Sequence, residues 1–148
     1  MRRTRFDDWP CPIARVTDLF GDWWTPLVLR DAFAGIKRFE DFQTNLGIPR
    51  AVLTARLTRL VDEGLLEKRR YEDKPPRDEY RLTAKGVAAW DILAAMWRYG
   101  EDWCWPDDTQ PKIELRNIET GQRIRPQVID GTTGEPLDLR ATRIKRRR

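Results

Sequence analysis

The segment over residues 50–63 carries side chains suited to contacts with phosphate groups and with base edges. It contains three arginines and no acidic residue up to position 61. Drawn as a helix at about 100° per residue, it places Leu53, Leu57 and Leu60 on one face, with Val61 beside them. The opposite face contains only small residues and arginine, namely Ala51, Thr54, Ala55, Thr58 and Arg59.

Two interpretations of this outward face are open from composition alone. Small residues let a helix backbone approach another surface closely, arginine suits phosphate and guanine edges, and Ala and Thr suit the thymine methyl group. The alternative is an ordinary amphipathic helix with little charge on its solvated side. The context in the chain has to decide between them.

Other kinds of chemistry have few candidate residues. The chain contains two cysteines, Cys11 and Cys104, and no histidine, so one chain is not expected to build a structural zinc site. It also lacks a glycine-rich phosphate loop, and no serine or cysteine has an evident base. We expect no enzyme activity and no cofactor.

Start and stop signals predict the elements that position the arginine-bearing segment. Pro12 suits a first helical turn, Asp22 can cap a second helix, and glycines at 21, 35 and 64 end helices. Helices are expected over 12–20, 23–33, 38–45, 50–63 and 84–104, with hairpin strands over 65–71 and 77–83. Pro75 and Pro76 are expected to prevent pairing at the hairpin tip.

This order of elements is that of a winged helix-turn-helix, a mainly α fold with a β-hairpin wing (α+β) and here a small C-terminal β appendage. In that fold the 50–63 helix enters the major groove of double-stranded DNA, and the hairpin reaches the neighbouring backbone. We divide the chain into an N-terminal arm (1–10), a winged-helix domain (11–105), a small β-rich extension (106–139) and a basic tail (140–148).

The charge and hydropathy patterns bound the possible partners. The net charge is +4, but residues 140–148 contribute six positive charges, so residues 1–139 sum to −2. The overall charge is therefore no argument for nucleic acid. The longest apolar run has six residues, Ile92 to Trp97, against roughly 20 needed to span a bilayer. We expect a cytoplasmic protein with no membrane partner.

Residues 11–104 closely resemble the HxlR-type branch of the MarR-like transcriptional regulators. One departure is Pro49, which stands where the family usually has a serine at the start of the recognition helix. The matching elements are Cys11-Pro12, Gly21, Trp24-Thr25, Arg38-Phe39, Gly47-Ile48, Leu53, Arg56, Leu57, Leu60, Gly64-Leu65 and the run Glu79-Tyr80-Arg81-Leu82-Thr83 followed by Gly86.

The resemblance implies a homodimer that represses or activates at pseudo-palindromic promoter sites, with the first and last helices of the domain at the dimer interface. The residues expected to contact DNA are Arg38, Arg50, Ala51, Thr54, Ala55, Arg56, Thr58, Arg59, Lys74 and Arg77. The residues expected at the interface are Ile13, Val16, Phe20, Trp90, Leu93 and Trp97. The alternative is a winged-helix module that binds protein instead of DNA.

Cys11 coincides with a position that several family members use as a thiol sensor. The positive end of the following helix and nearby Arg15 favour a thiolate there, whereas the simpler interpretation is a buried structural cysteine. A disulfide between Cys11 and Cys104 of two subunits is a further hypothesis. A small-molecule effector is also possible, but nothing in the sequence identifies one.

The extension carries two related turns. Thr120-Gly121-Gln122 and Thr133-Gly134-Glu135 recur at an offset of 13, each followed by an aliphatic residue. They are similar to the turns of the zinc-ribbon-like tails of some family members but lack the cysteines. We expect short strands around a metal-free ribbon, packed on the helical domain or on a second subunit, and a disordered basic tail.

Overall fold

Four short helices make up the first part of the chain, and local signals set their ends. The computed structural model describes residues 5–6, 8–105, 109 and 111–145. The helices are α1 (Pro12–Phe20), α2 (Trp24–Phe33), α3 (Phe39–Leu46) and α4 (Arg50–Asp62). Asp22 Oδ1 accepts the N–H groups of Trp24 and Thr25, both at 2.9 Å, which caps α2. These four helices confirm the predicted order.

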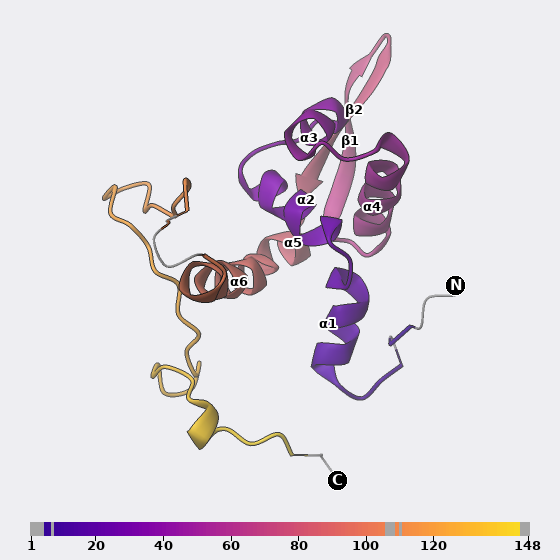
Figure 1. The fold of residues 1–148 in the computed structure, drawn as a ribbon. Coiled ribbons are helices and arrows are strands. Elements are labelled where there is room, and N and C mark those ends of the chain that lie inside the picture. Colours follow the sequence, from indigo (N-terminus) through magenta and orange to yellow (C-terminus); the bar gives the residue numbers. More distant parts are fainter. Residues whose placement is uncertain (1–4, 7, 106–108, 110, 146–148) are drawn as a thin grey trace. The chain divides into compact units, whose positions relative to one another are not determined.

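The hairpin follows α4 and extends further than the sequence suggested. Strand β1 (Leu66–Asp73) pairs antiparallel with β2 (Pro76–Leu82), and the pairing runs from Leu66 opposite Leu82 to Asp73 opposite Pro76. The prediction that the prolines prevent pairing at the tip is wrong. Pro76 is the first residue of its strand, a position that tolerates the missing N–H. Figure 1 shows the hairpin tip projecting beyond α3 and α4.

The loop before α3 is tied to the hairpin, which the sequence did not indicate. The N–H of Tyr80 donates to the carbonyl oxygen of Lys37 at 2.8 Å, and Arg38 forms an antiparallel bridge with Glu79. Arg38 is also the residue that precedes α3. The hairpin and the start of α3 therefore share one backbone hydrogen-bond network.

The single helix expected over 84–104 is two helices, α5 (Ala84–Ala88) and α6 (Trp90–Trp103). The break falls at Ala89, which is buried and whose N–H donates to the oxygen of Gly86, three residues back. Gly86 is itself pressed against the backbone of Leu65. A tertiary contact thus anchors α5 at the base of the hairpin, and the chain turns before α6 begins.

The buried apolar core comes from the helices, the turn before α4 and the base of the hairpin. The three leucines predicted to face inward on the 50–63 helix are all buried. The core consists of Val28, Leu29, Phe42, Ile48, Leu53, Leu57, Leu60, Leu65, Leu66 and Ala89. All of these residues lie in the first of two compact units, Met1–Trp90 and Asp91–Arg148.

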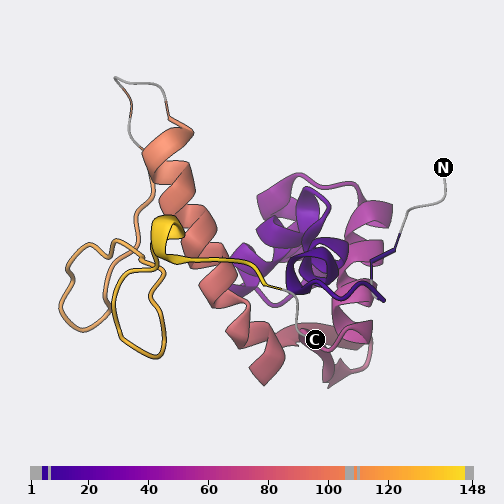
Figure 2. The same ribbon diagram turned by 90° about the horizontal axis from the view of Figure 1, so that it is seen from below.

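The second unit contains α6 and the C-terminal extension, which runs beside the helix in Figure 2. Arg123 contacts Glu101 at 3.1 Å and Arg125 contacts Asp102 at 2.9 Å, so the extension is joined to α6 by two ion pairs. A 3₁₀ turn, η1 (Leu139–Ala141), lies near its end. The described part of α6 buries no residue completely.

The two turns of the extension are built alike, as their repeat suggested. Gly121 and Gly134 have φ values of +68° and +77°, and the N–H of each donates to the carbonyl four residues earlier, that of Asn117 or Asp130. The expected short strands are absent from the described residues 111–145, where single bridges close each turn. The turns are too short and too isolated to extend a ladder.

The described residues of the whole chain contain neither a metal-binding cluster nor a membrane-spanning helix. Among them, no group of three or more Cys, Asp or Glu side chains is placed to hold a metal ion. None of the described helices is long and apolar enough to cross a bilayer.

Candidate nucleic-acid interface

The outward face of α4 is small, uncharged and open. The side chains that form it are exposed, while the leucines on the other side of the helix are buried. Thr54 Oγ1 donates to the carbonyl oxygen of Arg50 at 2.9 Å, so this hydroxyl is held against its own helix. The exposed members of the face are Ala51, Thr54, Ala55 and Thr58. The surface can therefore approach another molecule closely.

Two exposed arginines, one at the start of α4 and one before α3, lie on aromatic rings. The guanidinium carbon of Arg50, at the start of α4, is 4.6 Å from the centre of the Phe39 ring. That of Arg38 is 4.8 Å from the centre of the Tyr71 ring in β1. Such stacking restrains a long side chain while leaving its hydrogen-bond donors available. Stacking thus restrains the position of both positive charges at the surface.

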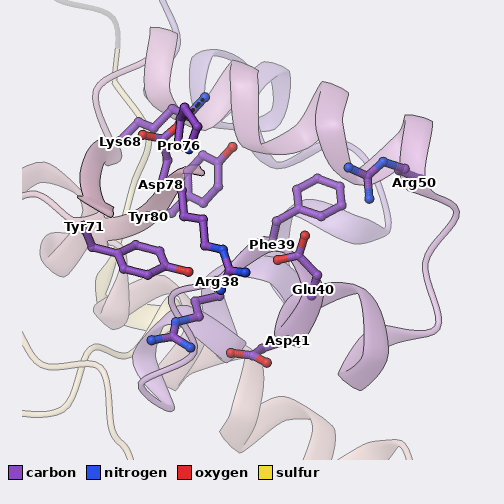
Figure 3. A pocket seen from close by; sticks show the side chains of 11 residues that line it. Arg38, Phe39, Glu40, Asp41, Arg50, Lys68, Tyr71, Pro76, Asp78 and Tyr80 are labelled. Carbon is purple, nitrogen blue, oxygen red and sulfur yellow. Dashed lines mark ion pairs between the residues drawn. The ribbon is translucent and has the colours of Figure 1, made fainter. Parts of the chain in front are cut away.

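A hollow of about 570 Å³ separates the start of α3 and α4 from the hairpin. Figure 3 shows its side chains converging from α3, α4 and both strands. Four of the lining residues are basic, three are acidic and three are aromatic. The lining consists of Arg38, Phe39, Glu40, Asp41, Arg50, Lys68, Tyr71, Pro76, Arg77, Asp78 and Tyr80. The hollow joins the two arginine stacks to the wing.

The basic residues of the wing are held by acids of the same hairpin. Asp78 lies 2.8 Å from Arg70 Nε and 3.3 Å from Lys68 Nζ. The hydrogen bond from Arg70, with a smaller one from Lys68, lowers the pKa of the Asp78 carboxyl below its ordinary value, and the same contact raises the pKa of Arg70. Arg77, predicted to contact DNA, is exposed and lies 3.4 Å from Glu72. Lys74 is exposed at the tip.

Two of the predicted contact arginines point away from the outward face. Arg59 Nη2 donates to the backbone oxygen of Asp18 at 2.7 Å and lies 3.3 Å from its Oδ2. Arg56 Nε lies 3.3 Å from Asp22 Oδ1. Placing Arg59 on the outward face was therefore wrong, because its long side chain turns to Asp18 near the end of α1. DNA contact by Arg56 and Arg59 stays a prediction.

Cys11 immediately precedes α1 and is half-buried. The Nε atom of neighbouring Arg15 donates to the backbone oxygen of Trp9 at 2.8 Å. Cys104 follows α6 and is exposed. The two cysteines lie in different compact units of the chain.

The predicted interface residues differ in exposure. In α1, Ile13 is 68% exposed, Val16 is exposed and Phe20 is partly buried. Trp90 is exposed and its ring centre lies 5.0 Å from that of Phe33. In α6, Leu93 and Trp97 are partly buried. Ile13 and Val16 thus leave an apolar surface on α1 that its own unit does not cover.

Sequence reasoning missed the aromatic partners of the arginines. The sequence placed Phe39 only within a helix over 38–45 and Tyr71 only at the end of a strand, and neither position indicated a contact with an arginine. The available signal was the Arg38-Phe39 pair followed 11 residues later by a second arginine at a helix start. Spacing alone does not show that the hairpin folds back beside it.

Comparisons with known proteins agree with this architecture. A family described as HxlR-like helix-turn-helix matches residues 19–108. The uncharacterized HTH-type transcriptional regulator Rv3095 of Mycobacterium tuberculosis is 37% identical over 86% of this chain and 80% of its own length. A second uncharacterized HTH-type regulator, sll1512 of Synechocystis, is 40% identical over 63% of this chain and 70% of its own.

Solved structures show the same fold. PA1607, a candidate transcription factor, superposes with a TM-score of 0.87 at 38% identity, covering 97% of this chain and all of its own. The redox regulator HypR in its reduced form has a TM-score of 0.58 at 29% identity, covering 62% of this chain and 92% of its own. The predicted α+β winged-helix class is confirmed. The chain belongs to the HxlR-like helix-turn-helix family of transcriptional regulators.

Proposed function

We propose that the protein is a sequence-selective DNA-binding repressor of transcription that acts as a homodimer on pseudo-palindromic promoter sites. The face formed by Ala51, Thr54, Ala55 and Thr58 would lie in the major groove. Arg50 and Arg38 would contact phosphates at its edge. Lys74 and Arg77 would hold the flanking backbone from the wing.

The observation that carries this proposal is the pairing of a small, open helix face with two stacked arginines. The exposed residues of α4 from Ala51 to Thr58 include no acid and no large apolar side chain. A helix that docks on protein would present large apolar or aromatic residues there. The rings of Phe39 and Tyr71 hold the guanidinium groups of Arg50 and Arg38, and both arginines line the hollow beside the start of α4.

A dimer accounts for the apolar surface on the first helix. Ile13 and Val16 are exposed on α1, and α6 buries no residue completely. Pairing of α1 and α6 between two copies would cover these side chains and set two recognition helices about one helical turn of DNA apart, or a multiple of it.

A thiol input at Cys11 is a second part of the proposal. The cysteine stands half-buried immediately before α1, at the position that the resemblance to HxlR-type regulators links to thiol sensing. Structures similar to this chain include that of the redox regulator HypR. Oxidation at Cys11 would then change the position of α1 and so the distance between the two recognition helices of the dimer.

The test is fluorescence anisotropy under reducing conditions, with DNA from upstream of the protein's own gene and a scrambled control, across a salt series. We expect tight binding to one DNA and weak binding to the other. Equal, weak and strongly salt-dependent binding to both would contradict the proposal and favour a protein-interaction module with a basic tail. Mild peroxide should lower the affinity of the wild type but not of Cys11→Ser.

A further inference from the structure

One flank of α4, between its buried leucines and its outward face, is joined by ion pairs to the end of α1 and to the residues that follow it. Arg56 and Arg59 are three residues apart in α4, so their side chains leave the helix on neighbouring positions of one side. Arg59 reaches Asp18 and Arg56 reaches Asp22, two acids four residues apart around the end of α1. Two separate ion pairs therefore join the same stretch of α4 to the same short segment.

Asp18 is buried and contacts Arg59 through two oxygen atoms. The residue is only 5% exposed, and Arg59 Nη2 donates to its backbone oxygen at 2.7 Å as well as lying 3.3 Å from its carboxylate. Arg5 Nε lies 3.8 Å from the same carboxylate oxygen. Removing one partner from a buried charge pair leaves the other poorly solvated, so this contact resists being opened.

The Asp22 contact connects two helices through one carboxylate. Oδ1 of Asp22 accepts the N–H groups that begin α2 and also lies 3.3 Å from Arg56 Nε. The start of α2 and the middle of α4 are thus fixed to the same atom. A movement of the α1–α2 segment cannot leave α4 in place without breaking one of these contacts.

We infer that Asp18 and Asp22, through Arg59 and Arg56, are positioning residues that set the orientation of the DNA-reading helix. Ala55 and Thr58 each stand beside one of the clamped arginines, so a small rotation of α4 moves both from their base pairs. Because Asp18 is part of α1, the clamp also passes any displacement of that helix to the DNA-reading face. The inference rests on the proposed function, since it concerns how the same face is held.

This role makes a different prediction from direct DNA contact by Arg59. If Arg59 contacts a phosphate, neutralising Asp18 removes its ion pair and a negative charge while the bond to the Asp18 backbone oxygen stays, so affinity holds or increases. If Arg59 is a clamp, neutralising Asp18 weakens selective binding, as removing Arg59 does. The sign of the Asp18→Asn effect therefore separates the two roles.

The experiment measures DNA affinity by fluorescence anisotropy, well below every melting temperature. Each protein is titrated against the upstream DNA that the wild type selects, here called the operator, and against scrambled DNA. The proteins are wild type, Asp18→Asn, Arg59→Gln and their double variant. We expect each single variant to bind the operator about tenfold more weakly and the double variant no worse than either. The salt slope, which is the slope of log affinity against log salt concentration, should not change. Arg30→Gln is the matched control. It removes the same charge from an ion pair with buried Asp31, at 2.7 Å, but on α2.

A second variant covers the case in which Asp18→Asn fails to fold. Asp22→Ser retains a capping oxygen for α2 and removes the charge that faces Arg56, so it should also bind the operator more weakly with an unchanged salt slope. The inference is overturned if Arg59→Gln and Asp22→Ser both bind the operator within twofold of wild type. It is also overturned if the salt slope of Arg59→Gln falls by about one, because that result indicates a phosphate contact. If the wild type itself does not select the operator, the proposed function fails first, and that result is visible before any variant is compared.

Discussion

Gly86 offers a sharp test of how the wing is anchored. It lies in α5, it is buried, and a Cβ atom built on it would stand 2.0 Å from the backbone oxygen of Leu65. Contacts of a Cβ with backbone atoms below 3.0 Å essentially do not occur, so Gly86→Ala must displace α5 from Leu65 by about 1 Å. The partner is backbone, which cannot rotate away as a side chain can.

The displacement would disturb the hydrogen bonds that hold α5 to the hairpin. The N–H of Thr83 donates to the oxygen of Leu65 at 3.0 Å, and the Thr83 hydroxyl donates to the oxygen of Gly64 at 2.6 Å. Overpacking of a tight site typically costs 1–3 kcal/mol, and loss of one of these bonds adds about 1 kcal/mol. We expect Gly86→Ala to lower the free energy of unfolding by about 3 kcal/mol.

The assay is urea unfolding followed by tryptophan fluorescence, with Gly100→Ala as the control. Gly100 lies within α6 and an added Cβ meets nothing within 4 Å, so alanine there should be neutral or stabilising by up to about 1 kcal/mol. A Gly86→Ala protein that unfolds within 0.5 kcal/mol of wild type would refute the reasoning, because α5 could not then be held against Leu65 as described.

Three further predictions concern the edges of the site. Arg50→Ala should weaken binding to operator and scrambled DNA alike and lower the salt slope by about one, since the stacked guanidinium contacts phosphate; an unchanged slope in a salt titration would contradict this. Thr83→Ala, which removes the acceptor 3.0 Å from the Gly86 N–H, should cost about 1–2 kcal/mol in urea unfolding, and a loss below 0.3 kcal/mol would count against the cap. Because the hydrogen bond from Arg70 lowers the pKa of Asp78, that pair should stabilise the wing above about pH 4 and lose its effect as pH falls through the lowered pKa. The difference in melting temperature between wild type and Asp78→Asn should therefore shrink below pH 4, and a constant difference would speak against the pair.

Helix positions could be predicted from the sequence because their ends depend on nearby residues. Pro12, the Asp22 cap and Gly47, whose φ is +62°, act within one turn of the helices that they delimit. The break at Ala89 depends on contact between Gly86 and Leu65, 21 residues earlier, and no local pattern reveals it. Helical periodicity runs through the break, which is why one helix was expected.

Of the site, only the two faces of α4 could be predicted from the sequence. The wheel placed the buried leucines and the small outward residues correctly, because both follow from helical geometry. It could not show that Arg59 bends back to Asp18, 41 residues away in sequence. Arg59 lies at the margin of the wheel, where a long side chain can reach either face, and the distant partner decides which one.

The measurement that tests the central claim most directly is the operator affinity of Ala55→Glu. Ala55 is exposed in the middle of the α4 face, so glutamate there leaves the core intact and places a negative charge against the bases or phosphates. We expect selective binding to weaken by about 100-fold or more with an unchanged melting temperature, while Ala84→Glu, at the exposed start of α5, binds as wild type does. Wild-type affinity in a folded Ala55→Glu protein would show that DNA does not bind at this face.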